Sequence, residues 1–208
     1  MPNLITTRPI DATFSLEHKT SQLVFPDNFI APTSEYQMAG GICWPLLMEN
    51  NVFQGAAVLA GRNVKTGIIY VFEQEPFASI EHIKDGDGNI TSRGLAPWFT
   101  KNWATYYAFR YYWFQVDEYN RMFRLRIRKC AMINPKPSLV DVHWADDEHA
   151  QIIISDYLEQ HKLKIQSGTM LHEQLEQQKA DPDKGPFPAI HAAACMLTGI
   201  SEKRFPEE

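Results

Sequence analysis

The stretch VFQGAAVLAGRNVKTGIIYVFEQ, Val52 to Gln74, predicts two strands and the turn that joins them. Two apolar runs, about Val52–Ala60 and Gly67–Glu73, have the length and residue types of strands. Between them, the segment GRNVKTG supplies two glycines and an asparagine, which suit a hairpin connection. The stretch therefore predicts a β-hairpin.

The composition indicates a folded globular protein. The chain has 208 residues, of which 44% are hydrophobic and 22% charged, with a net charge of -5. The N-terminus lacks a basic and then apolar signal segment, and no apolar run is long enough for a membrane span. Three separated cysteines without a C-x-x-C pair argue against a disulfide framework. We therefore expect a cytoplasmic protein with no membrane association.

The two halves of the chain differ in character, which predicts an α+β fold. Residues 1–96 read as β-rich, and residues 97–208 read as a mostly helical region with one basic strand, although a single domain is also compatible. Within the first half, KDGDGNITSRG marks a loop. Its DGDGN start resembles a calcium loop, but Ile90 and Ala96 occupy the required glycine and glutamate positions, so a tight polar turn is expected.

Helices are predicted for most of the second half. One follows Pro97 from Trp98 to about Glu118, although its aromatic residues also have strong strand propensity. After a strand in SLVDVHW, an acidic first turn favours a helix from about Asp146 to His161. A further helix is expected in SGTMLHEQLEQQKAD with Thr169 near its N-cap, and a last one in FPAIHAAACMLTG, closed by Gly199.

The segment from Trp98 to Phe114 contains ten aromatic residues, which allow three readings. A helix so aromatic is expected to be buried on most sides. An intersubunit surface is the second reading, because tyrosine and tryptophan are enriched at interfaces. Exposed rings that stack on bases are the third. The core reading is favoured, because so many exposed rings would promote aggregation.

The stretch NRMFRLRIRK, Asn120 to Lys129, alternates arginine with apolar residues, which predicts a strand with a row of guanidiniums on one face. Its surroundings are unusually basic. From Trp98 to Lys136 the net charge is +6, and because the whole chain is -5, the remainder is -11. The row predicts either contact with a polyanion or ion pairs with carboxylates such as Asp146 to Glu148.

An acidic cluster follows in DVHWADDEHA. Histidine and carboxylates this close together are able to bind a divalent metal, with His143, Asp147 and His149 as the candidate set. The spacing matches no helical zinc pattern, and a strand followed by an acidic helix cap explains most of the cluster. A metal-dependent hydrolase is therefore kept as the less favoured alternative.

The order of elements from about Arg121 to Ala180 resembles ribbon-helix-helix DNA-binding regulators. The resemblance rests on a basic strand followed by helices, and it departs from the family by a second strand and a proline loop. It implies a dimer whose Arg124, Arg126 and Arg128 read DNA.

The sequence therefore predicts a non-enzymatic, dimeric or higher-oligomeric DNA-binding protein that regulates transcription or acts as an accessory factor, without a cofactor. The residues expected to bind double-stranded DNA are Arg121, Arg124, Arg126, Arg128, Lys129 and Lys136. No residue is predicted to be catalytic. A structural protein that assembles through the aromatic block is the other alternative.

Overall fold

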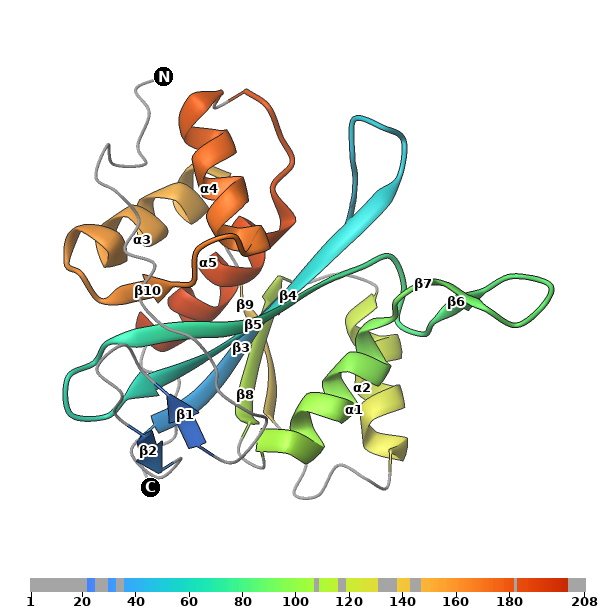
Figure 1. Cartoon of the computed structure of the whole chain (residues 1–208), viewed down its shortest axis with the longest axis horizontal. Helices are drawn as coiled ribbons and strands as arrows, with labels where there is room; N and C mark the ends of the chain where they lie inside the picture. Colours follow the sequence, from blue (N-terminus) through green and yellow to red (C-terminus); the bar gives the residue numbers. More distant parts are fainter. Residues whose placement is uncertain are drawn as a thin grey trace.

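The computed structural model of the chain describes residues 22–24, 30–32, 36–106, 109–115, 119–130, 138–142, 147–181 and 183–201 (Figure 1). The strands are β1 (Gln22–Val24), β2 (Ile30–Pro32), β3 (Tyr36–Leu47), β4 (Phe53–Asn63), β5 (Ile69–Phe77), β6 (Ile83–Lys84), β7 (Ile90–Ser92), β8 (Phe109–Gln115), β9 (Ser138–Val142) and β10 (Leu163–Ile165). The helices are α1 (Leu95–Tyr106), α2 (Tyr119–Lys129), α3 (Asp147–Glu159), α4 (Met170–Ala180) and α5 (Pro188–Ser201).

A six-stranded mixed sheet organises the molecule, in the order β10-β5-β4-β3-β8-β9. Strand β4 pairs antiparallel with both β3 and β5, whereas β3, β8 and β9 are parallel neighbours and β10 is parallel to β5. The sheet draws strands from both sides of residue 96. The predicted α+β fold class is confirmed, since helices pack on this sheet.

The hairpin predicted around the quoted stretch is confirmed as β4 and β5. The side-chain oxygen of Asn63 accepts hydrogen bonds from the backbone N–H groups of Lys65 and Thr66, both at 2.9 Å. Gly67 then adopts a φ of 72°, in the left-handed region that glycine enters without steric cost. The asparagine and the second glycine of the turn therefore each have a specific conformational role.

Helix α5 covers one face of the sheet and forms most of the core with it. Every residue of α5 from Pro188 to Ile200 except His191 is buried, and Ala39, Cys43 and Val58 of the sheet belong to the same apolar cluster. Gly199 lies inside the helix, so the predicted end at that residue is wrong. Burial on all sides explains the apolar composition of α5, because no helix face needs to be polar.

The two other predicted C-terminal helices are present as α3 and α4, beside α5 in Figure 1. Thr169 is the N-cap of α4, as predicted, but its hydroxyl donates to the Gln166 carbonyl at 2.8 Å and does not cap the helix. Instead, Gln74 of β5 accepts the Leu171 N–H at 2.7 Å. A sheet residue thus satisfies one of the unpaired N–H groups of the first turn.

The DGDGN segment forms the tight polar turn that the sequence predicts, between β6 and β7. The Asp85 carboxylate accepts hydrogen bonds from the Asp87 and Asn89 N–H groups and from the Asn89 side-chain amide. The Asn89 side-chain bond is the largest of the causes that lower the pKa of Asp85 below its usual value. The β6–β7 hairpin projects from the body of the molecule (Figure 1).

The predicted long aromatic helix is wrong. The segment divides into α1, which ends at Tyr106, and β8, which begins at Phe109 beside the central strand β3. The second part has strong strand propensity. It forms a strand because a position between β3 and β9 provides two partners for its backbone. The part of the chain that the structure describes contains no helix long and apolar enough to cross a membrane.

The basic strand predicted for Asn120 to Lys129 is also wrong, because these residues form helix α2. Asn120, Phe123 and Ile127 are buried, at the i, i+3 and i+7 spacing of one helical face. Leu125, which alternation would place beside Phe123 and Ile127, is 46% exposed. Phe123 and Ile127 fit both the strand period and the helix period, and their packing favours the helix.

We expect Gly41→Ala to lower the free energy of unfolding by about 1 to 3 kcal/mol, the usual cost of overpacking a core. A Cβ at Gly41 would overlap the Ala192 carbonyl oxygen of α5 and lie 3.1 Å from the Met196 Cβ. Gly86→Ala is the matched control, because a Cβ there has no heavy atom within 4 Å. Urea denaturation of both variants measures the difference, and equal stabilities would contradict this packing.

Candidate functional site

Aromatic contacts hold the buried face of α2 against the sheet and α1. The Phe123 ring meets Trp44 of β3 and Phe99 of α1 edge-on, with centroid distances of 5.7 and 5.4 Å. The Trp44 indole N–H donates a hydrogen bond to the buried side-chain oxygen of Asn120. A polar group of the helix start is thereby satisfied inside the aromatic cluster, which fixes the rotation of α2 about its axis.

The basic side chains of α2 lie on the two flanks and the outer side of the helix, around its buried face. Arg121, Arg126, Arg128 and Lys129 are exposed, Arg124 is half-buried, and the sequence YNRMFRLRIRK contains no acidic residue. Arg121, Arg124 and Arg128 recur at the i, i+3 and i+7 positions that form one helical stripe. Five of the six predicted binding residues therefore lie on one helix, whereas Lys136 is outside the described residues.

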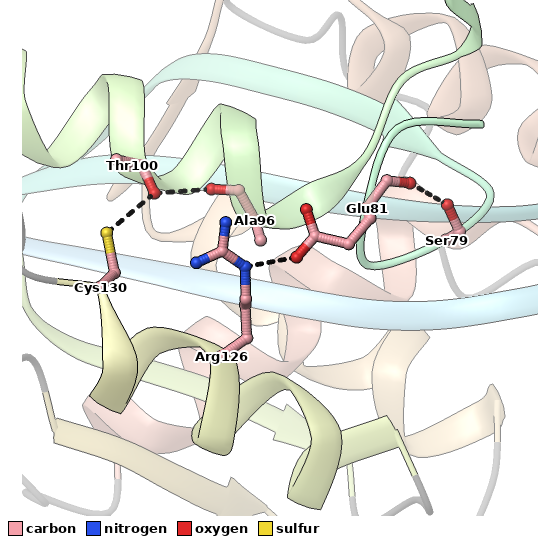
Figure 2. Close-up of polar contacts among 6 residues, drawn as sticks. All are labelled: Ser79, Glu81, Ala96, Thr100, Arg126 and Cys130. Atoms are coloured by element: carbon pink, nitrogen blue, oxygen red, sulfur yellow. Dashed lines mark hydrogen bonds and ion pairs between the residues drawn. The ribbon is translucent and has the colours of Figure 1, made fainter. Parts of the chain in front are cut away.

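One arginine of α2 has an acidic partner that the sequence did not indicate. The Arg126 Nε donates to the Glu81 carboxylate, in the segment that follows β5 (Figure 2). Both side chains are about half exposed, at 44% and 54%, so the pair contributes little stability. Ser79 donates to the Glu81 carbonyl oxygen, which restrains the same segment. The contact places Glu81 beside the basic helix.

A cavity of about 540 Å³ lies next to this segment. We call it the hairpin cavity, because it is bounded by β5, the base of the β6–β7 hairpin and the start of α1. Its lining consists of Glu75, His82, Ile90, Thr91, Ser92, Arg93, Gly94, Pro97 and Trp98. Apart from Trp98, which belongs to the aromatic segment considered for base stacking or an interface, none of these residues was predicted to be functional. They come from separate segments and form no local motif, so only the fold brings them together.

The predicted metal set is not assembled among the described residues. His143 lies outside them, Asp147 is the first residue of α3, and His149 is exposed and lines a different cavity with Arg62 and Lys162. Within the described ranges, no group of three histidine, cysteine or acidic side chains is placed to hold a metal ion. The central strand β3, YQMAGGICWPLL, contains no carboxylate at all.

Along the chain, carboxylates occur in or directly after the neighbouring parallel strands β8 and β9. Asp141 lies in β9 and is paired in register with Phe114 of β8. Asp117 and Glu118 follow β8 in the chain, and Asp146 and Asp147 follow β9. Ligands of open α/β sheets bind beyond the carboxyl ends of parallel strands, which makes this edge of the sheet the second region of interest.

Comparison with known proteins identifies a similar fold. The chain is similar to the crystal structure of the large terminase nuclease from thermophilic phage G20c with bound magnesium, with a TM-score of 0.51, 9% identity, and 94% of this chain and 93% of that chain covered. The P22 large terminase nuclease domain gives a TM-score of 0.48 and 9% identity, with coverage of 85% and 86%. No protein-family model matches the sequence, and no curated protein is similar enough to be matched.

These comparisons correct the predicted function. The solved structure with a TM-score above 0.5 is a nuclease and not a ribbon-helix-helix transcription regulator. The prediction of a transcription regulator that reads DNA with an arginine-lined strand is therefore wrong. The error has one physical origin, because the strand on which it rested is helix α2.

Two truncations distinguish the helical packing of α2 from the strand that alternation predicts. We expect Phe123→Ala to cost about 3 to 5 kcal/mol, because a fully buried ring leaves a cavity. Leu125→Ala should cost only about 0.5 kcal/mol, as for other surface positions. Chemical denaturation measures both values. Similar costs for the two variants would favour the alternating strand.

Proposed function

We propose that this protein is a metal-dependent hydrolase of nucleic-acid phosphodiester bonds. The observation that carries the proposal is the likeness of almost the whole chain to a nuclease that binds magnesium. Carboxylates in or directly after two adjacent parallel strands support it, since this is the chemistry that magnesium requires. In the reaction, a water oxygen adds to phosphorus, one P–O bond breaks, and the products end in a phosphate and a hydroxyl.

The nucleic acid would be held by the outward face of α2. Arginine presents a planar fork of donors that matches phosphate oxygens, and α2 extends for about 16 Å at 1.5 Å per residue. Helix α2 contains no acidic residue, whereas the chain as a whole has a net charge of -5. The five contacts proposed are Arg121, Arg124, Arg126, Arg128 and Lys129. A dimeric state and a cytoplasmic location stay predictions.

The carboxylate oxygens in and after β8 and β9 are the kind of ligand that a hard divalent cation prefers. Magnesium is commonly held by one or two protein carboxylates together with substrate phosphates, so it does not require three protein ligands. Asp141 is the candidate that lies inside a described strand, with Asp147 at the start of α3 as the second. When bound, the ion would polarise the phosphoryl oxygen and lower the pKa of a water molecule.

Binding is tested first with the double variant Arg121→Ala/Arg128→Ala. Loss of two phosphate contacts should weaken binding of any oligonucleotide sequence and make the slope of log affinity against log salt less steep by about 2. Lys65→Ala/Lys162→Ala is the charge-matched control, because these exposed lysines lie at another cavity. Fluorescence anisotropy over a salt series measures the slopes, and equal slopes for the two doubles would refute the role of α2.

Cleavage is tested with labelled single-stranded and duplex DNA and RNA in magnesium or manganese. Wild type should cleave, and EDTA should abolish cleavage. The cleavage activity of Asp141→Asn should fall by more than the factor of about 10 to 100 that is typical of losing a residue behind the metal ligands. Asp147→Asn tests the second candidate, and exposed Asp183→Asn is the control. A wild-type protein that cleaves none of these substrates with either metal would eliminate the hydrolase proposal.

A further inference from the structure

The hairpin cavity contains an ion pair between a buried carboxylate and an exposed arginine. Glu75 is only 8% exposed, and its two carboxylate oxygens lie 3.0 and 3.3 Å from the Arg93 Nη1. Gln74 points toward α4, so Glu75 faces the side of the sheet that carries α1 and α2. Glu75 therefore holds one guanidinium nitrogen of Arg93 at the cavity. The Arg93 side chain is 73% exposed.

A histidine in the same cavity is held in one tautomer. The Gly94 N–H donates to the His82 Nδ1 at 3.0 Å, so this nitrogen is an acceptor and the proton of the neutral ring is on Nε2. Gly94 is required for this approach, because a Cβ there would overlap the backbone of Glu81 and His82. His82 therefore adds a second donor whose orientation is set by the backbone.

The remaining walls are partly apolar. Trp98 and Pro97 come from α1, and Ile90 from β7. A volume of about 540 Å³ falls within the range of about 300 to 1,000 Å³ usual for small-molecule sites. The cavity thus combines apolar walls with a few polar groups, which is the usual composition of a specific binding pocket.

We propose that the hairpin cavity binds one unpaired nucleobase of a nucleic-acid strand. The Glu75–Arg93 pair is neutral overall and presents acceptors beside donors, as the edge of a base does. A phosphate group offers only acceptors and would meet the Glu75 carboxylate, so it fits this cavity less well. This inference rests on the proposed function and names its substrate class, a strand with at least one unpaired base.

The position of the cavity agrees with the proposed backbone contact. Glu81, the neighbour of His82, pairs with Arg126 of α2, so the segment that lines the cavity also touches the basic helix (Figure 2). A strand that contacts α2 beside Arg126 would also pass the segment that lines the cavity. The phosphates then meet the positive helix, and the neutral base meets the neutral ion pair.

The first experiment separates base from phosphate by titrating the isotopically labelled protein with free nucleosides and with inorganic phosphate. Saturable shifts of the Trp98 indole and His82 ring signals are expected with at least one nucleoside, whereas phosphate should leave them unchanged. Trp98→Phe assigns the indole signal among the five tryptophans. The inference is overturned if phosphate shifts these signals as strongly, or if no nucleoside shifts them up to its solubility limit.

Two variants test the same cavity with oligonucleotides. Arg93→Lys keeps a cation for Glu75 but loses the fork, so the preference for single strands over duplex should fall about fivefold or more at an unchanged melting temperature. Ser92→Trp should fill the cavity and abolish nucleoside binding, and Val64→Trp, at an exposed site, is its control. Wild-type behaviour of both Arg93→Lys and Ser92→Trp overturns the inference.

Failure of this inference and failure of the proposed function give different results. Metal-dependent cleavage without any nucleoside effect would leave the hydrolase proposal standing and remove the base pocket. Nucleoside binding without cleavage in either metal would leave the base pocket standing and remove the hydrolase proposal.

Discussion

The close approach of α5 to β3 is the constraint on which the rest of the structure depends. With no side chain at Gly41, the Ala192 carbonyl contacts the central strand, and the alanines of α5 pack against Ala39 and Cys43. Small residues on both surfaces allow the helix and the sheet to approach closely, as dense core packing requires. Because β3 is paired on both sides, by β4 and β8, its position sets the register of both halves of the sheet.

The second face of the sheet is organised by a different interaction, the contact of α2 with Trp44 and Phe99. The edge-on rings and the hydrogen bond from the Trp44 indole to Asn120 set one rotation of the helix. The consequence is electrostatic, because that rotation directs the basic side chains outward. The Arg126–Glu81 pair then connects the helix to the hairpin cavity. Core packing on one side of α2 thus positions the groups proposed to bind nucleic acid on the other.

The two sides of the molecule differ in how local their determinants are. The β4–β5 hairpin and the helices α3 to α5 follow from contiguous sequence signals, namely the Asn63 turn, an acidic first turn and an apolar run. The hairpin cavity has no such signal, since Glu75, His82 and Trp98 belong to a strand, a loop and a helix. Its polar groups become a site only through long-range packing.

By itself, the sequence determined the α+β class, the quoted hairpin, the polar turn at Asp85 and the basic character of residues 120–129. These properties depend on composition and on neighbours within a few positions, which a sequence displays directly. Tertiary structure alone decided that the basic residues form a helix and that the aromatic segment ends in a central strand. In NRMFRLRIRK, Phe123 and Ile127 satisfy both the strand and the helix period, while Leu125 satisfies only the strand. The rings of Trp44 and Phe99, which lie far away in the chain, pack against one face of the helix and so favour the helix over the strand.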